Sequence, residues 1–427
     1  MNKCKKKVMR FLKNQKLFID QIEADQVLAD FECEMKNGLE GMKSSLAMIP
    51  TYISADKKLP IGKPVIAIDA GGTNLRVAVI KFSEDGLSEI KNYVTHEMPG
   101  SKRKIGKDSF FERLVEYILP VANKADSIGF CFSYKAEISP DCDGKLLKWS
   151  KEIKAPDVVG EYIGANIKEK LKTLGYNHKI VILNDSVATL LAGKSIDPIR
   201  NYDTFVGFIL GTGTNTAYIE QNCNILKNPE LNPGDSQVIN VESGEFIKAP
   251  RSKVDLIFDR NTAEPGHYIF EKMLSGAYLG PLCFTVLKEA ANAGLFTDTA
   301  KQAILNLKEI STIEVDQFLR NPFKRAQMIT DDDRSTIVHL VAHVVERAAY
   351  LTAINISAAV LKSNCGNNIL HPVGITVDGS TFYKVKDFAS LVAYYLKNIL
   401  DKRDLYYEML HVENAPLLGA AVAALTN

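Results

Sequence analysis

The sequence has few cysteines, and their positions match neither a disulfide framework nor a redox motif. The seven cysteines are scattered along the chain, their number is odd, and no two form a CxxC pair. Disulfide frameworks use paired cysteines in even number, and redox motifs use two cysteines at short spacing. We therefore expect reduced thiols in a protein of the cytoplasm.

The chain also has almost no net charge and few long apolar runs. Lys and Arg number 52 against 51 Asp and Glu, a net charge of +1. Without a basic excess, we expect neither a nucleic acid nor an anionic membrane as partner. No apolar run reaches the ~18 residues of a membrane span. The basic start, Lys3–Arg10, is followed by no apolar region or small-residue cleavage site, so we expect no signal peptide.

What the chain has is length and even composition. Its 427 residues suggest two or three domains, at roughly 150 residues each. No linker-like or low-complexity segment interrupts them. We therefore expect tightly joined domains.

The stretch Val65–Ile80 is the most informative part of the chain. Two apolar runs flank Asp69-Ala70-Gly71-Gly72-Thr73-Asn74, which predicts two buried strands joined by a tight glycine turn. Such a turn lets a ligand approach the backbone, and its N–H groups can bind an anion. Asp69 ends the first strand, where a hard cation such as Mg²⁺ prefers a carboxylate. The pattern favours a phosphate-binding hairpin, and a plain glycine-turn hairpin is the alternative.

The same pattern returns later in the chain. Phe205–Leu210 predicts a strand, Gly211–Asn215 a glycine-threonine turn, and Thr216–Glu220 a second strand. Two such hairpins, each followed by further strand and helix segments, indicate two related halves. Phosphate-type turns facing each other would line a cleft between them. A strand over Ile369–Val377 ends in a third possible phosphate turn, at Asp378-Gly379-Ser380.

The remaining pattern predicts further elements. We expect helices over about 18–48, 110–119, 158–174, 187–192, 268–279, 312–320, 331–361, 387–401 and 419–425, and strands over 87–94, 127–133 and 179–183. Met48–Tyr52 is expected to be extended. The segment before Trp149 has a polar, loop-like composition.

Several polar residues are candidates for chemistry, each with a simpler alternative. Asn184-Asp185 lies where a strand meets a helix, and a carboxylate there could accept a proton from an alcohol that attacks a phosphoryl group. Both residue types are also common N-caps. Glu242 and Glu271 could accept hydrogen bonds from hydroxyl groups, although isolated acidic residues usually lie on a solvated surface. Ser133 and the pair Ser150-Lys151 are weak candidates when taken singly.

Taken together in this order, the motifs are specific. From about residue 18 to its end, the chain resembles the sugar kinases of the hexokinase type, in the actin-like ATPase superfamily. The segments that carry the resemblance are Phe31–Leu39, Met48–Thr51, Asp69–Val77, Leu183–Thr189, Gly211–Tyr218, Val238–Glu242, Phe270–Gly280 and Val377–Ser380.

The resemblance implies two actin-like (ribonuclease H-like) α/β domains around a central cleft. The small domain would span 63–183, completed by 414–427, and the large domain would span 184–413, with the N-terminal 1–62. The implied activity is ATP-dependent phosphorylation of glucose or a related hexose at its 6-hydroxyl, with Mg²⁺. Alternatives are a kinase that prefers mannose, fructose or an amino sugar, and a sugar sensor that transfers little or no phosphate. A monomer and a homodimer both remain open.

The resemblance also implies residue roles. Asp185 would be the general base, with Lys151 as a second catalytic residue, and Asp69 would hold Mg²⁺. The hexose would be held by Ser133, Ser150, Lys151, Asn184, Asp185, Asn215, Glu242 and Glu271. ATP would contact Asp69, Gly71, Gly72, Thr73, Asn74, Arg76, Gly211, Thr212, Gly213, Gly379, Ser380 and Gly419.

The chain departs from the family pattern on the sugar side. The usual proline after the aromatic residue that follows Ser133 is replaced by Lys135. The usual threonine before Lys151 is Ser150, and the usual tryptophan after Glu242 is Ser243. These departures put substrate preference in question more than the phosphoryl chemistry.

Overall fold

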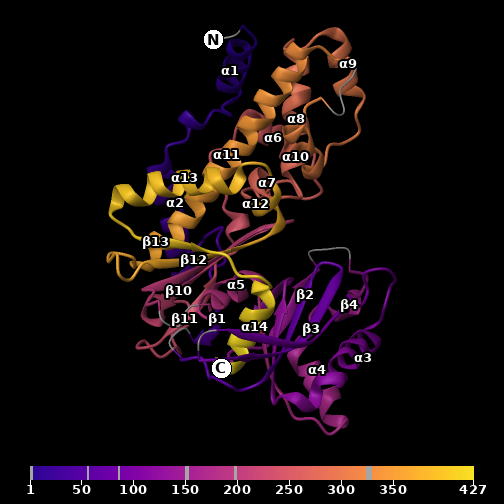
Figure 1. Ribbon diagram of the computed structural model, residues 1–427, viewed down its shortest axis with the longest axis vertical. Coiled ribbons are helices and arrows are strands. Elements are labelled where there is room, and N and C mark those ends of the chain that lie inside the picture. Colours follow the sequence, from indigo (N-terminus) through magenta and orange to yellow (C-terminus); the bar gives the residue numbers. More distant parts are fainter. Residues whose placement is uncertain (1–2, 55–56, 85–86, 150–152, 197–199, 324–328) are drawn as a thin grey trace.

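The computed structural model describes residues 3–54, 57–84, 87–149, 153–196, 200–323 and 329–427. It is built around a five-stranded and a six-stranded β-sheet, which lie at about the same height in the lower half of Figure 1. The predicted α/β fold class is confirmed. We call the unit around the five-stranded sheet the small lobe and the unit around the six-stranded sheet the large lobe.

The small lobe contains a mixed sheet with strand order β4-β3-β2-β5-β8. Strands β2, β3 and β4 form an antiparallel meander, and β5 and β8 add to β2 in parallel. The strands are β2 (Val65–Gly71), β3 (Asn74–Phe82), β4 (Ser88–Glu97), β5 (Ser127–Phe132) and β8 (Lys179–Leu183).

Both faces of this sheet are covered, which explains the unbroken apolar run of β2. Ile66 and Ile68 face helices α3 (Lys107–Ile118) and α4 (Ile163–Thr173). Val65 and Ala67 belong to the core on the opposite face. A strand whose residues are buried on both faces carries no polar alternation.

The large lobe repeats this topology, as the duplicated hairpin predicts. Its strand order is β1-β11-β10-β9-β12-β13, in which β9, β10 and β11 are antiparallel and β12 and β13 continue from β9 in parallel. Strand β1 adds to the edge. The strands are β1 (Ile49–Ser54), β9 (Thr204–Leu210), β10 (Thr214–Gln221), β11 (Ser236–Asn240), β12 (Val373–Asp378) and β13 (Tyr407–Leu410).

Two helices lie between the sheets. Helix α5 packs against β9 and β12, and α14 packs against β2 and β5 and crosses α5. Glycines allow this close approach: a Cβ on Gly419 would lie 1.7 Å from the Ala188 oxygen, and one on Gly129 would lie 1.8 Å from the Ala420 oxygen. Their bounds are α5 (Asp185–Gly193) and α14 (Ala415–Thr426).

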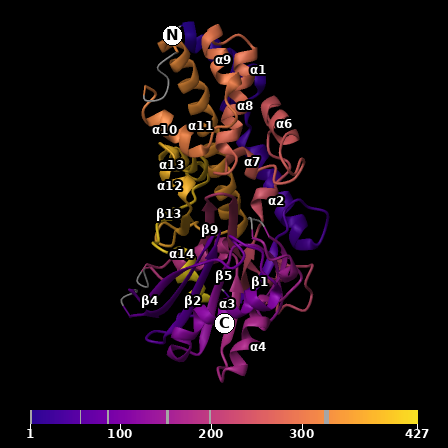
Figure 2. The same ribbon diagram turned by 90° about the vertical axis from the view of Figure 1, so that its right-hand side faces the viewer.

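The other helices extend the large lobe away from the small sheet (Figures 1 and 2). They are α1 (Lys3–Gln15), α2 (Ala24–Glu40), α6 (Lys253–Arg260), α7 (Glu271–Leu274), α8 (Leu279–Asn292), α9 (Asp298–Asn306), α10 (Thr312–Arg320), α11 (Asp331–Ser363), α12 (Ser380–Lys384) and α13 (Phe388–Leu400). Short 3₁₀ turns occur at 19–21, 119–124, 156–158, 222–224, 243–245 and 401–403.

Helix α11 is the central helix of the large lobe. Its length and apolar composition alone would suffice for a membrane span, an exception to the sequence expectation, but 61% of its most apolar window is buried inside the protein. Arg347, halfway along it, is fully buried and makes two hydrogen bonds of 2.7 and 2.6 Å to Asp255 of α6.

Several predicted boundaries are wrong for physical reasons. Helix α2 covers only part of 18–48, because Gly41 adopts a left-handed conformation (φ 75°) and ends it. The predicted helix over 268–279 is the single turn α7, and α8 begins where a stop is expected. Gly280 is required for packing, since a Cβ there would lie 2.3 Å from the backbone of Ser311. The loop-like segment before Trp149 contains a hairpin, β6 (Lys135–Ile138) and β7 (Gly144–Lys148).

Candidate active site

The first predicted phosphate turn is a tight hairpin between β2 and β3. Gly71 pairs with Asn74, so that Gly72 and Thr73 form a two-residue loop, and Gly72 has a φ of 69°. This conformation strongly favours glycine. The Tyr134 hydroxyl donates a 2.8 Å hydrogen bond to the Gly72 oxygen and so holds the turn against the end of β5.

Asp69 lies at the end of β2, directly before this turn. Its carboxylate accepts a 2.7 Å hydrogen bond from the Arg76 guanidinium. Burial raises the pKa of Asp69, the charge of Arg76 opposes the increase, and the negative charges of Asp185 and Asp378 add to it. The charges of Asp185, at the start of α5, and of Asp378, at the end of β12, thus act on Asp69 from two other elements.

The second turn, Gly211–Gly213, is held by backbone and side-chain contacts from neighbouring segments. The Gly211 oxygen accepts hydrogen bonds of 2.8 Å from both the Gly276 N–H and the Thr381 hydroxyl. Gly379 follows β12 with a φ of 121°, and a Cβ there would lie 2.2 Å from the Leu210 oxygen. The structure therefore brings the second turn and the predicted adenosine-side turn together.

A network of amides and carboxylates occupies the sugar side of the predicted site. The Asn215 amide nitrogen lies 2.7 Å from the Asn240 oxygen and 3.3 Å from the Asn184 oxygen. The Asn240 nitrogen in turn donates a 2.8 Å bond to Glu242. Glu242 has a left-handed backbone (φ 60°), and burial raises the pKa of its carboxyl. These groups can pair with sugar hydroxyls.

Asn184 and Asp185 join β8 to α5, and the two alternatives for this pair are compatible. Asn184 is the N-cap, accepting a 2.9 Å bond from the Ser186 N–H. Asp185 occupies the first helical position, where the helix dipole stabilises its negative charge. The Asp185 carboxylate also accepts a 2.9 Å hydrogen bond from the Ser186 N–H, so both residues contribute to this helix end.

Glu271 is the first residue of α7 and lies on the sugar side of the site. One carboxylate oxygen accepts a 2.9 Å hydrogen bond from the Thr214 N–H. Burial raises the pKa of Glu271 to about 7, and the negative charges of Glu242, Glu245 and Asp185 contribute. A Cβ on Gly213 would lie 2.5 Å from the same carboxylate, so the second turn and the sugar side are in direct contact.

Four predicted residues are not linked to this cluster by the contacts described above. Ser150 and Lys151 lie outside the described residues. Gly419 is buried in α14 against Ala188, and its predicted place beside adenosine stays a prediction. Ser133 follows β5, and its N–H lies 3.3 Å from the oxygen of Ala70, next to Asp69.

Sequence reasoning did not assign roles to several residues that the structure places here. Asn240 links Asn215 to Glu242, and the Thr381 hydroxyl supports the second turn. Glu245 contacts Lys135 of the opposite lobe, with 3.8 Å between Nζ and Oε1. The position of Asn240, two residues before Glu242, is a signal that could have identified it. Glu245 could not have been found without its distant partner.

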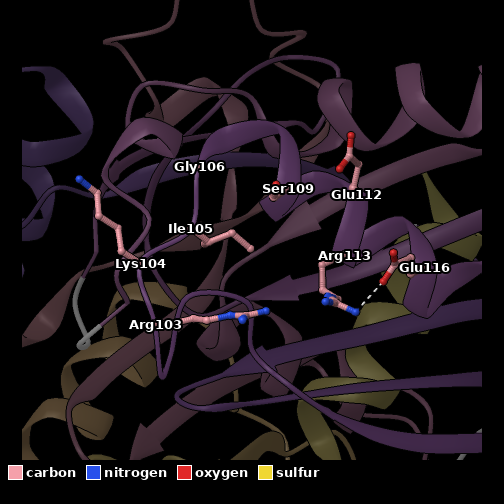
Figure 3. A pocket seen from close by; sticks show the side chains of 8 residues that line it. All are labelled: Arg103, Lys104, Ile105, Gly106, Ser109, Glu112, Arg113 and Glu116. Atoms are coloured by element: carbon pink, nitrogen blue, oxygen red, sulfur yellow. Dashed lines mark hydrogen bonds and ion pairs between the residues drawn. The ribbon is translucent and has the colours of Figure 1, made fainter.

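One cavity adjoins this site, and another lies apart from it. One adjoins it between the lobes and is lined by Thr51, Phe132, Tyr134, Ala136, Ile138, Ile182, Leu183, Asn184, Asn240 and Glu242. The other lies at the start of α3 (Figure 3) and is lined by Arg103, Lys104, Ile105, Gly106, Ser109, Glu112, Arg113 and Glu116. The second contains none of the predicted site residues.

The residues at Asp69 fit a water-coordinated cation better than a protein cage. In the described part of the chain, no three His, Cys, Asp or Glu side chains gather as metal ligands. Asp69 nevertheless offers a carboxylate of the type that Mg²⁺ prefers, and Mg²⁺ commonly keeps several waters and binds substrate phosphates.

Comparison with known proteins agrees with this geometry. Two family models described as hexokinase match residues 8–195 and 205–426. Glucokinase-1 of Kluyveromyces lactis is 30% identical over 85% of this chain and 86% of its own length. Human hexokinase-3 is 30% identical over 88% of this chain, which spans only 42% of that protein.

Solved structures show the same fold. A Schistosoma mansoni hexokinase in complex with glucose superposes with a TM-score of 0.76 at 22% identity, over all of both chains. A second hexokinase gives a TM-score of 0.78 at 20% identity, over 99% of both chains. The predicted actin-like two-domain fold is thereby confirmed. The chain belongs to the hexokinase family and is a sugar kinase, a phosphotransferase that uses ATP to phosphorylate a hexose.

Proposed function

We propose that the chain transfers the γ-phosphoryl group of ATP to the 6-hydroxyl of glucose or a closely related hexose, with Asp185 as general base. The observation that carries the proposal is the place of Asp185. The side-chain oxygen of its neighbour Asn184 lies 3.3 Å from the Asn215 amide nitrogen on the sugar side, and the negative charge of Asp185 raises the pKa of Asp69 beside the first phosphate turn. A base for this reaction has to lie between the two substrates.

The sugar would be held by Asn184, Asn215, Glu242 and Glu271, with Ser133, Ser150 and Lys151 from the small-lobe side. Paired amides and carboxylates discriminate against ligands that lack a hydroxyl, because the buried polar groups are then left without a partner. The glycine turns would surround the phosphates with backbone N–H groups, which stabilise negative charge.

In the transfer step, the 6-oxygen forms a bond to the γ-phosphorus while the bond to the leaving ADP oxygen breaks. The proton of the hydroxyl passes to the Asp185 carboxylate. Arg76, whose side chain is partly exposed beside Asp69, would contact a phosphate oxygen. Asp69 would hold Mg²⁺ through water, and the ion would offset the negative charge of the phosphates.

The domain limits, location and assembly belong to the same proposal. We assign residues 63–183 and 414–427 to the small domain, because α14 packs on the small sheet, and the remainder to the large domain. Cys33, Cys131, Cys142, Cys223, Cys283 and Cys365 are all free, which supports a reducing, cytoplasmic location. Monomer and homodimer remain equal alternatives.

The test compares wild type, Asp185→Asn and the exposed control Asp108→Asn. Each is assayed for phosphate transfer from Mg·ATP to glucose, mannose, fructose and glucosamine, and for glucose binding by calorimetry. Asp185→Asn should lower kcat by about 10²–10⁴-fold while glucose still binds. 6-Deoxyglucose should bind without accepting phosphate. Wild type that binds glucose but phosphorylates none of these sugars would contradict the proposal and favour a sensor.

A further inference from the structure

Two lysines of the β6–β7 hairpin in the small lobe contact the large lobe. Lys135 and Lys148 stand opposite each other in the ladder. The Lys135 ammonium lies 3.8 Å from a Glu245 oxygen, and Lys148 pairs with Glu264. Both glutamates belong to the segment between Glu242 and Glu271, which forms the sugar side of the site. Two ion pairs therefore link the hairpin to the sugar side of the site.

Of the two contacts, the pair Lys135–Glu245 is the more sheltered. The exposed fractions of its side chains are 39% and 19%, against 54% and 44% for Lys148 and Glu264. Glu245 is also anchored, since its second carboxylate oxygen accepts a 3.0 Å hydrogen bond from the Tyr268 N–H. A fixed and partly buried carboxylate gives a cation a better defined partner than a mobile surface residue does.

The acidic residues of the sugar side attract the positive charge of Lys135. Four carboxyl groups lie on the sugar side of the site, which we call the acidic wall, and their mutual repulsion contributes to the raised pKa of Glu271. They belong to Glu242, Glu245, Glu271 and Asp185. Lys135 opposes this effect, since its positive charge lowers the pKa of Glu242. A cation from the opposite lobe is thus attracted to the acidic wall when the lobes approach.

The residues before Lys135 connect the pair to the phosphate side. The Ser133 N–H lies 3.3 Å from the Ala70 oxygen, and the Tyr134 hydroxyl bonds the Gly72 oxygen in the first turn. Three consecutive residues therefore contact the phosphate hairpin at one end and Glu245 at the other.

We propose that Lys135 and Glu245 form an ion pair across the cleft that draws the small lobe onto the bound hexose. Lys135 is then a positioning residue that sets sugar affinity, and the phosphoryl chemistry does not depend on it. The inference rests on the proposed function of the site, because it requires the hexose to bind between the lobes.

The test is a double-mutant cycle of Lys135→Met, Glu245→Gln and the combined variant, with glucose affinity measured by calorimetry and KM and kcat measured separately. Each single variant should raise the Kd and KM for glucose about two- to fivefold, with a smaller change in kcat. The combined variant should be no weaker than either single variant. Lys135→Arg should restore wild-type affinity. Added salt should weaken glucose binding to wild type more than to Lys135→Met.

The matched control is Lys145→Met, which removes the same charge from the same hairpin. Lys145 faces the Tyr162 ring of its own lobe, so its loss should leave glucose affinity unchanged. Additive effects in the cycle, or an equal loss in Lys145→Met, would overturn the proposal. If wild type binds glucose but transfers no phosphate, the proposed function fails, whereas the calorimetric cycle still decides whether the ion pair exists.

Discussion

Replacing Glu271 with glutamine should remove a pH dependence from the stability of the protein. The pKa of this carboxyl rises from its ordinary 4.5 to about 7 on folding. Between these two values the folded protein holds a proton that the unfolded chain has released, so the free energy of unfolding falls as pH rises. Above pH 7 the folded protein carries a buried charge, at a cost of roughly 3 kcal/mol.

The magnitude follows from the two pKa values. From pH 5 to pH 8, wild type should lose about 2.5 kcal/mol of stability relative to Glu271→Gln. Glutamine has the same size, and its amide oxygen can still accept the hydrogen bond from the Thr214 N–H, so packing is retained. The variant should therefore be close to wild type at pH 5 and clearly more stable at pH 8.

The assay is urea denaturation followed by far-UV circular dichroism at pH 5, 6, 7 and 8. Glu32→Gln, which removes an exposed carboxyl from α2, is the matched control and should keep the wild-type pH dependence. If wild type and Glu271→Gln show parallel pH profiles, Glu271 is ionised throughout this range and the argument from burial is wrong. The same result in Glu32→Gln would assign the effect to net charge.

Three further substitutions test other parts of the structure. Arg347→Ala should lower the free energy of unfolding by about 3–5 kcal/mol, because a buried carboxylate on α6 loses its partner; an unchanged urea midpoint would contradict this. Gly419→Ala should cost at least about 3 kcal/mol, because its Cβ would overlap the Ala188 oxygen; a thermal melt at the wild-type temperature would refute the close helix contact. Asn240→Ala should weaken glucose binding roughly tenfold while kcat changes little; calorimetry and kinetics measure both.

The parts of the fold that could be predicted are those with local causes. Asp69-Ala70-Gly71-Gly72 specifies its turn through backbone freedom and flanking apolar runs, and the Gly211–Gly213 turn follows the same rule. Their recurrence is enough to predict two related lobes. The sugar-side residues Asn184, Asn215, Glu242 and Glu271 came from the resemblance, and the structure brings them together.

The parts that could not be predicted depend on distant partners. Gly280 is a normal stop signal, yet it lies inside the first turn of α8, because close packing against Ser311 requires the absence of a Cβ. In the β6–β7 hairpin, β6 (KAEI) alternates polar and apolar residues over only four positions, and β7 (GKLLK) does not alternate. The importance of Lys135 arises from Glu245, more than 100 residues further along the chain. No local pattern contains this information.

The position of α14 has a consequence for biosynthesis. This helix covers one face of the small sheet, but more than about 200 residues separate it from β8, the last strand of that sheet. At ~5–20 residues per second, a ribosome needs roughly 10–40 s to make the intervening chain. During that time the apolar face formed by Val65 and Ala67 lacks its cover. The small lobe is therefore completed late in synthesis, and its nascent sheet is a surface that chaperones can recognise.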